Sequence, residues 1–202
     1  MKQCLAISMR MVEHEYPGGV YEVRDALSHD WYSFLSTVLP EFSYILIPNV
    51  GGEERVRNHN IDGIILTGGD DWGVFPLRDQ TESMLFHYAK PRQIPLLGIC
   101  RGAQVINRLL GGNLVTIPNH VGQRHRVHLD HGTKIVNSFH SFGCGKKDLA
   151  KGLHPLALDD EGHVEAFSGS RLLGLIWHPE REQTVDAWDK RQIRHLFLGE
   201  DL

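Results

Sequence analysis

Short apolar runs that alternate with helical segments place the strongest constraint on how this chain folds. Four such runs lie in the first half of the sequence: "CLAIS" at 4–8, "YILIP" at 44–48, "IDGIILTGG" at 61–69 and "IPLLGI" at 94–99. Runs this short and apolar are typical of buried strands, and their alternation with helices favours a parallel sheet. The sequence therefore predicts an α/β fold: a doubly wound, flavodoxin-like, mostly parallel sheet with helices on both faces.

The segments between these runs have helical periodicity. Apolar residues recur at helical spacing over 21–39, after a turn at "YPGG", so that segment is expected to be one amphipathic helix. Further helices are expected over 53–60, 79–90, 103–112 and 184–198. In the C-terminal half the pattern changes to short strands such as "RHRVHL", "KIVNS" and "HVEAF". That change predicts a smaller antiparallel β region.

The size and composition of the chain suit a single domain over 1–202. Of its 202 residues, 41% are apolar and 23% are charged, with a formal net charge of −4. This balance predicts neither a nucleic-acid nor a membrane partner. The three cysteines form no disulfide framework, and Arg10 and Glu13 interrupt the first apolar stretch as no signal peptide would. A cytoplasmic protein is expected, with its oligomeric state left open and a homodimer among the options.

A lone cysteine lies where an apolar run meets an amphipathic one. Cys100 is flanked by Gly98 and Gly102 in "GICRG", which has the form of a nucleophile elbow. A sharp strand-to-helix turn would expose the sulfur, and the positive end of the new helix would favour a thiolate. The alternative is a small buried apolar residue. Cys4 is expected in the core and Cys144 in a loop.

A cysteine nucleophile needs a histidine, usually oriented by a third group. Of the thirteen histidines, His178 stands out because it ends the apolar run "LLGLIWHPE". In an extended segment His178 and Glu180 would point the same way, so Glu180 would hold one imidazole nitrogen while the other faces sulfur. The alternative is an ordinary surface strand end.

A second histidine-rich stretch raises the question of a metal. His125, His128 and His131 are three residues apart, and His120 lies upstream. In a strand, residues three apart point to opposite faces, and no cysteine or carboxylate set completes a tetrahedral site. The sequence therefore predicts no metal and no organic cofactor.

Taken together, "GICRGAQ", "LTGGDD", "NSFHSF" and "WHPE" resemble the class I glutamine amidotransferase-like family over nearly the whole chain. "GICRG" with "NSFH" and "VEAF" resembles its branch of free-standing γ-glutamyl hydrolases. The resemblance implies that Cys100 is the nucleophile, His178 the base and Glu180 its orienter. It implies an oxyanion hole built from the amides of Gly69 and Arg101.

The same resemblance implies where substrate binds. Gln104 would contact the glutamyl moiety, and the amides of Ser141 and Phe142, beside His140, would receive its α-carboxylate. The family's γ-glutamyl hydrolases often have "HHQ" at 140–142, whereas "HSF" is commoner in glutaminase subunits. That departure leaves the leaving-group pocket open, and an ordinary strand and turn remains the alternative for "NSFH".

A narrower resemblance, carried by the chain length, "VRDALSHDW" and Arg10, is to bacterial γ-glutamyl-CDP-amidate hydrolases. It implies a nucleotide-linked small-molecule substrate used in phosphoramidate decoration of surface polysaccharide. Positive donors for its phosphates would come from Arg10, Arg101, Arg124 and Arg126, although the last two fit ordinary surface charges equally well.

Other functions remain open at this point. A glutaminase subunit would deliver ammonia to a separate synthase partner. A redox-sensing or chaperone-like relative would have an oxidation-prone Cys100 and no need for Glu180. A non-catalytic binding protein would have no use for the complete set of Cys100, His178 and Glu180. The sequence assigns no role to Asp70, Asp71 or Trp72.

Overall fold

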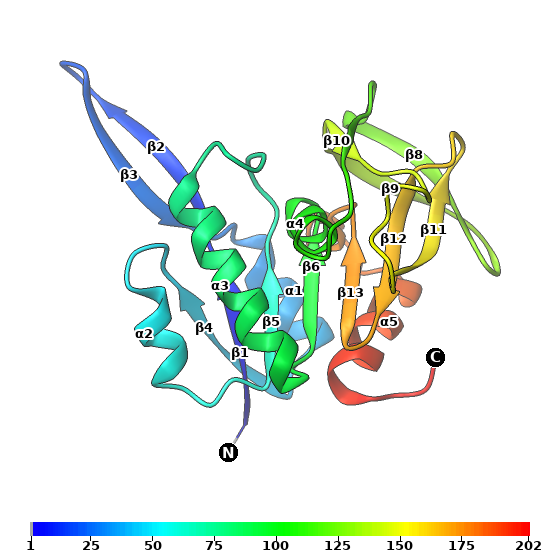
Figure 1. Ribbon diagram of the computed structural model, residues 1–202, viewed down its shortest axis with the longest axis horizontal. Helices are drawn as coiled ribbons and strands as arrows, with labels where there is room; N and C mark the ends of the chain where they lie inside the picture. Colours follow the sequence, from blue (N-terminus) through cyan, green and yellow to red (C-terminus); the bar gives the residue numbers. More distant parts are fainter. Residues whose placement is uncertain (1) are drawn as a thin grey trace.

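A nine-stranded sheet forms the centre of the molecule (Figure 1). The computed structural model describes residues 2–202. The strands are β1 (Gln3–Ser8), β2 (Arg10–Tyr16), β3 (Val20–Ala26), β4 (Phe42–Ile47), β5 (Gly63–Leu66), β6 (Leu96–Ile99), β7 (Val115–Thr116), β8 (Val121–Leu129), β9 (Gly132–Phe139), β10 (Phe142–Gly143), β11 (His154–Asp159), β12 (Val164–Gly169) and β13 (Leu172–Leu175). The helices are α1 (Asp30–Val38), α2 (Gly52–Arg57), α3 (Pro76–Arg92), α4 (Arg101–Leu109) and α5 (Ala187–Leu198), with a 3-10 turn at Pro179–Arg181.

The parallel half of the sheet has the strand order β4-β1-β5-β6-β13. This is the flavodoxin-like order, because the second parallel strand lies outside the first and the others follow on its far side. Side chains alternate between the two faces: Leu5 and Ile7 pack with α1 and α5, whereas Ala6 packs with α2, α3 and α4. The predicted doubly wound architecture, with helices on both faces, is therefore confirmed.

The antiparallel region continues the same sheet. Strand β13 pairs parallel with β6 on one side and antiparallel with β12 on the other. Strands β11, β8 and β9 follow β12 in antiparallel order. The expected strands of the C-terminal half are present. Strand β11, with Pro155 near its start, carries too short an apolar pattern to be recognised from the sequence.

One expected helix is wrong in its first half. The helical spacing predicts a single amphipathic helix over 21–39. In the structure Val20–Ala26 is strand β3, which pairs with β2 in a hairpin, and the helix begins only at Asp30. The predicted turn at "YPGG" closes this hairpin, with Gly18 and Gly19 at positive φ. Beyond that turn Val20, Tyr21 and Val23 favour a strand, which overrides the accidental helical spacing.

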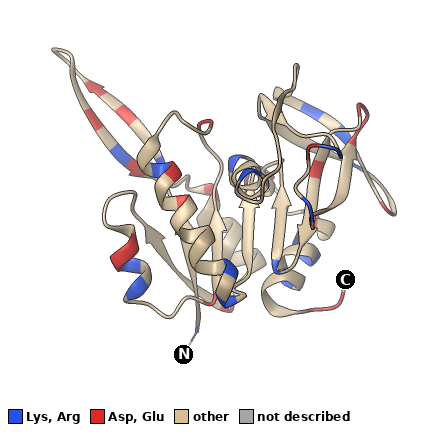
Figure 2. Cartoon of the chain, viewed as in Figure 1, with Lys and Arg blue, Asp and Glu red and all other residues tan. Residues whose placement is uncertain are grey.

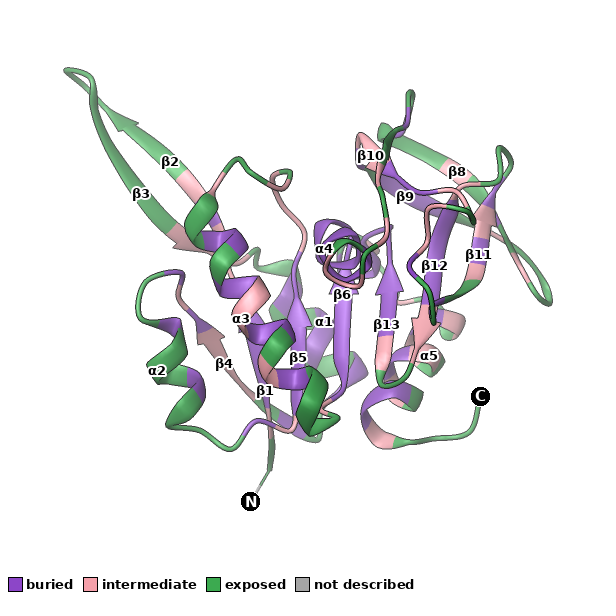
Figure 3. Cartoon of the chain, viewed as in Figure 1, coloured by how far each residue is buried: buried purple, intermediate pink, exposed green. Residues whose placement is uncertain are grey.

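The hairpin lies away from the sheet and its outer part is exposed (Figure 3). Charges of both signs are interspersed over the hairpin and the helices (Figure 2). Within residues 2–202, no helix is both long enough and apolar enough to span a bilayer.

Candidate active site

The turn between β6 and α4 holds Cys100 in a conformation that few side chains adopt. Cys100 has φ 51° and ψ −108°, and its backbone N–H donates to the carbonyl of Leu175 at 2.7 Å. The flanking glycines are required by close approach. A Cβ on Gly98 would lie 2.5 Å from the amide nitrogen of Ala103, and one on Gly102 would lie 2.1 Å from the carbonyl oxygen of Leu66. The strain and the glycines together are those of a nucleophile elbow.

The surroundings of Cys100 separate it from the other two thiols. It lies directly before the first residue of α4, at the positive end of that helix. Burial raises the pKa of the Cys144 thiol to about 12, with nearby Asp148 adding to the effect. Cys144 lies in the loop after β10, as expected, and is buried there, and Cys4 is partly buried in β1.

His178 connects the sulfur to a carboxylate. Its Nδ1–H donates to Oε1 of Glu180 at 2.7 Å, which leaves Nε2 without a commitment to Glu180. Burial opposes the positive charge on His178. The sulfur of Cys100 and then Glu180 outweigh burial and raise the pKa of His178 to about 9. His178 therefore lies between a thiol and a carboxylate that both act on its charge, which is the arrangement of the histidine in a catalytic triad.

The backbone around His178 differs from the expected extended segment. Strand β13 ends at Leu175, and Pro179–Arg181 forms a 3-10 turn that folds the Glu180 carboxylate back towards the ring of His178. Asn137 fixes this turn, because its side chain donates to the carbonyl of His178 at 2.8 Å and accepts from its N–H at 2.9 Å. Asn137 belongs to the motif "NSFH", but its type and spacing alone predict no role for it.

The glycine loop after β5 lies against His178. A Cβ on Gly68 would lie 2.5 Å from Cε1 of His178, and one on Gly69 would lie 2.0 Å from Nη1 of Arg78. Gly69 has φ +150°, so its conformation also disfavours a side chain. The loop therefore packs closely against both His178 and Arg78.

A buried ion-pair network below the elbow was not foreseen. Both guanidinium groups, of Arg78 and Arg101, contact the carboxylate of Glu82, and Arg101 also pairs with Asp79. Arg78 donates to the carbonyls of Thr67 and Gly68 at 2.9 Å, tying the glycine loop to the network. Burial and the neighbouring charge of Arg78 lower the pKa of Arg101 to about 9.

This network corrects one expectation about phosphate binding. The side chain of Arg101 is almost fully buried and committed to Asp79 and Glu82, so it is no donor to a substrate phosphate. Arg124 and Arg126 pair with Glu182 and Asp160 at the surface, as ordinary surface charges do. Arg10 lies beside the glycine loop, partly exposed, and pairs with Asp70 at 3.3 Å.

The residues expected to bind substrate converge from α4 and from the segment after β9. The side-chain amide of Gln104 donates to the carbonyl of Phe142 at 2.7 Å, and the Nδ1–H of His140 donates to the same carbonyl at 3.0 Å. Ser141 accepts from the N–H of Ile117 at 2.8 Å through its own carbonyl. These contacts fix the backbone of 140–142 next to the elbow helix.

An open cavity of about 660 Å³ adjoins this segment. The residues that line it include Gln104 and Phe142. They also include Asp71, Trp72 and Arg108. The guanidinium of Arg108 lies 5.3 Å from the ring centre of Trp72. From the sequence Arg108 is expected only to lie in a helix, because helical spacing does not show which side chains line a cavity.

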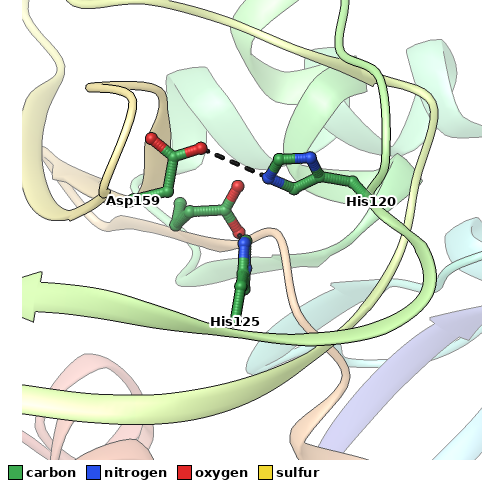
Figure 4. A group of neighbouring side chains, drawn as sticks. His120, His125 and Asp159 are labelled. Carbon is green, nitrogen blue, oxygen red and sulfur yellow. Dashed lines mark hydrogen bonds and ion pairs between the residues drawn. The ribbon is translucent and has the colours of Figure 1, made fainter.

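The expectation that no carboxylates complete the histidine set is wrong. His120 and His125 lie with Asp159 and Glu165, and one ligand atom of each lies within 4.8 Å of the others. Asp159 ends β11 and Glu165 lies in β12, so the sheet brings together residues that are far apart in the sequence (Figure 4). His128, by contrast, pairs with exposed Asp160 on the other face of β8, as the strand argument predicts.

Comparison with known proteins agrees with this geometry. The sequence profile of the Peptidase C26 family matches residues 43–180, a range that contains Cys100, His178 and Glu180. The chain is 30% identical to γ-glutamyl-CDP-amidate hydrolase of Campylobacter jejuni, covering 90% of this chain and 92% of that protein. It is 28% identical to γ-glutamyl-γ-aminobutyrate hydrolase of Escherichia coli O157:H7, covering 83% and 74% respectively.

Solved structures share the fold. A glutamine amidotransferase from Thermotoga maritima superposes with a TM-score of 0.62 over 98% of this chain and 84% of that one. The two sequences are 16% identical, so the likeness concerns the arrangement of sheet and helices.

Proposed function

Because the chain belongs to the peptidase C26 family, whose members seen here hydrolyse γ-glutamyl amide bonds, we propose that Cys100, His178 and Glu180 carry out this hydrolysis. One observation carries the assignment. The 2.7 Å hydrogen bond from Nδ1–H of His178 to Glu180 leaves the other ring nitrogen for Cys100, a strained elbow cysteine close enough to raise the pKa of His178. That orientation is what a thiolate–imidazolium pair needs.

In the first half of the reaction the thiolate of Cys100 attacks the γ-carbonyl carbon, and the carbonyl π electrons move to oxygen. The amides of Gly69 and Arg101 donate to this oxyanion. His178 then transfers its proton to the leaving nitrogen as the carbon–nitrogen bond breaks. The products are the free amine or amidate and a glutamyl thioester on Cys100.

In the second half a water molecule attacks the thioester carbonyl while His178 accepts its proton. The carbon–sulfur bond breaks, glutamate leaves, and the thiolate–imidazolium pair is restored. Glu180 keeps its hydrogen bond to His178 throughout, which fixes the tautomer and stabilises the imidazolium.

The glutamyl group is proposed to bind against Gln104 and the 140–142 segment. Gln104 and His140 hold the carbonyl of Phe142, and that contact positions the amides of Ser141 and Phe142 for the α-carboxylate. Arg10 stands beside the glycine loop, where an anionic leaving group would emerge.

For the leaving group we propose cytidine diphosphoramidate, so that the substrate is γ-glutamyl-CDP-amidate from surface-polysaccharide phosphoramidate synthesis. The support is the relative from Campylobacter jejuni, which is matched over 92% of its length. The positions of Arg10 and Arg108 add to this, because each offers a guanidinium near the site for a phosphate. Under this proposal the enzyme is one domain over 1–202 and acts in the cytoplasm. Its reaction uses no metal and no organic cofactor, and it has no nucleic-acid or membrane partner. A homodimer remains compatible with it.

A second candidate is a glutaminase subunit that delivers ammonia to a synthase partner. The observation that favours it is "HSF" at 140–142 in place of "HHQ". Such a subunit would release glutamate from glutamine slowly alone and rapidly with its partner.

Glutamate release from a panel of substrates distinguishes the two candidates. The panel contains glutamine, simple γ-glutamyl amines, γ-glutamyl peptides and γ-glutamyl-CDP-amidate, with Cys100→Ala as the blank and Glu180→Gln as the test of the orienter. Fast release from γ-glutamyl-CDP-amidate alone supports the proposal. Glutamate release only from glutamine refutes γ-glutamyl-CDP-amidate as the substrate. Activity that survives in Cys100→Ala refutes the assignment of Cys100 as the nucleophile.

A further inference from the structure

We propose that His120, His125, Asp159 and Glu165 form a binding site for one divalent transition-metal ion, best matched by Zn²⁺. The proposal concerns the antiparallel region and does not depend on the reaction assigned to Cys100. The four ligand atoms lie within 4.8 Å of one another and come from three strands or their ends (Figure 4).

The contacts of His120 direct its Nε2 towards Asp159. Its Nδ1 lies 2.8 Å from the carbonyl of Pro118, which can only accept, so Nδ1 carries the proton. The other ring nitrogen, Nε2, lies 3.2 Å from Oδ2 of Asp159. Both atoms are ligands of the kind that transition-metal ions bind, and they face each other across the cluster.

The carboxylate of Glu165 gives a second, independent indication. Glu165 is fully buried, and neither of its oxygens accepts a hydrogen bond from any residue that the structure describes. Nε2 of His125 approaches one oxygen at 3.4 Å, and Nε2 of His140 approaches the other at 3.5 Å. A fully buried carboxylate without a hydrogen bond is costly, so an ion bound to its oxygens would satisfy it.

Charge and ligand type select the metal. Two carboxylates and two neutral imidazoles carry a charge that one divalent ion cancels within the buried cluster. Imidazole ligands favour Zn²⁺ over Ca²⁺ or Mg²⁺, which prefer oxygen ligands alone. Tetrahedral zinc would need ligand atoms about 3.3 Å apart, given bonds of about 2.0–2.1 Å. Small side-chain rotations therefore have to draw the four ligands inwards.

The surroundings are those of a supported and accessible metal site. The carbonyl of Pro118 holds the ring of His120, and His163 donates through Nδ1 to the carboxylate of Asp159 at 2.8 Å. Hydrogen bonds from neighbouring groups to the ligand side chains orient those side chains in metal sites. A cavity of about 480 Å³ lined by His120, His125 and Asp159 opens next to the cluster, so an ion has a route from solvent. A bound ion would join β8, β11 and β12.

The test measures zinc bound to the full-length chain. All proteins carry Cys100→Ala, so that the thiol contributes no zinc site, and affinity tags are removed. Each is stripped with a chelator, loaded with Zn²⁺, freed of excess by gel filtration and analysed by elemental mass spectrometry. The two test variants are His125→Ala and Glu165→Gln. The matched control is His128→Ala, a histidine on the same strand but outside the cluster.

The expected result is about one zinc per chain in the parent and in His128→Ala, with at least about tenfold weaker zinc binding in His125→Ala and Glu165→Gln. The parent loaded with Co²⁺ should show the intense visible bands of a tetrahedral site. Because these spectra need no variant, a misfolded variant leaves the proposal testable. A parent that retains less than one tenth of a zinc per chain, or a folded His125→Ala that binds zinc as the parent does, overturns it.

Discussion

Replacing Gly102 with alanine tests whether the elbow works through close contact between α4 and β5. Gly102 lies in the first turn of α4, and a Cβ there would sit 2.1 Å from the carbonyl oxygen and 2.8 Å from the Cβ of Leu66. Ordinary contact begins at 3.4 Å, so helix and strand must separate by about 1 Å. The opposing carbonyl belongs to the backbone of a central strand and has no rotamer by which to move.

The expected magnitude follows from that displacement. The first turn of α4 carries the Arg101 amide and directly follows Cys100, so both move relative to the glycine loop. A misplacement of about 1 Å is expected to lower kcat/KM by about 100-fold. Overpacking is expected to reduce the free energy of unfolding by about 1–3 kcal/mol. The stabilisation from a stiffer unfolded chain, about 0.4–1 kcal/mol, offsets only part of this.

The assay compares glutamate release by wild type and Gly102→Ala with the best substrate of the panel, at a temperature where urea titration shows both to be folded. Gly145→Ala is the matched control, because a Cβ at Gly145 meets only a carboxylate oxygen of Asp148, at 3.4 Å. If Gly102→Ala keeps kcat/KM within threefold of wild type, the elbow does not depend on this contact.

Three further predictions concern the supports of the site. The pKa of His178 is raised from 6.5 to about 9, so the stabilisation from the charged His178 is complete below pH 6.5 and is lost as pH rises through 9. Urea unfolding should therefore show that the free energy of unfolding of wild type exceeds that of His178→Gln by less and less across this interval. Arg101→Leu leaves Asp79 and Glu82 buried without that partner, and should lower the free energy of unfolding by about 3–5 kcal/mol in the same assay. Asn137→Ala leaves the N–H and carbonyl of His178 unpaired, and should destabilise the fold by about 1–3 kcal/mol while lowering kcat/KM.

The parts of the fold and site that follow from the sequence are those encoded by neighbouring residues. The elbow depends on Gly98 and Gly102 either side of Cys100, and its short apolar strand and glycine-closed helix are local patterns. His178 and Glu180 are two residues apart. The sequence places them together correctly although the connecting backbone is a 3-10 turn instead of a strand.

The features that the sequence does not reveal depend on long-range packing. Arg78 and Glu82 are spaced like a surface ion pair on a helix, but α3 turns that face towards the elbow, where both are fully buried. Asp159 joins His120 and His125 only because β11 lies beside β8 in the sheet. In the hairpin, by contrast, a local signal was present: Val20 and Tyr21 directly after a Pro-Gly-Gly turn favour a strand, and the accidental helical spacing obscured it.

The position of β13 has a consequence for how the enzyme is made. Cys100 lies on the strand–helix turn after β6, whereas His178 follows β13, and nearly the whole antiparallel region is synthesised between them. During translation Cys100 therefore leaves the ribosome well before His178 exists, and contacts between such distant segments form late in folding. The N–H of Cys100 itself bonds to the carbonyl of Leu175 in β13, so even the backbone of the elbow is completed by that strand. The surroundings of Cys100 are thus completed only with β13, the last strand in the sequence.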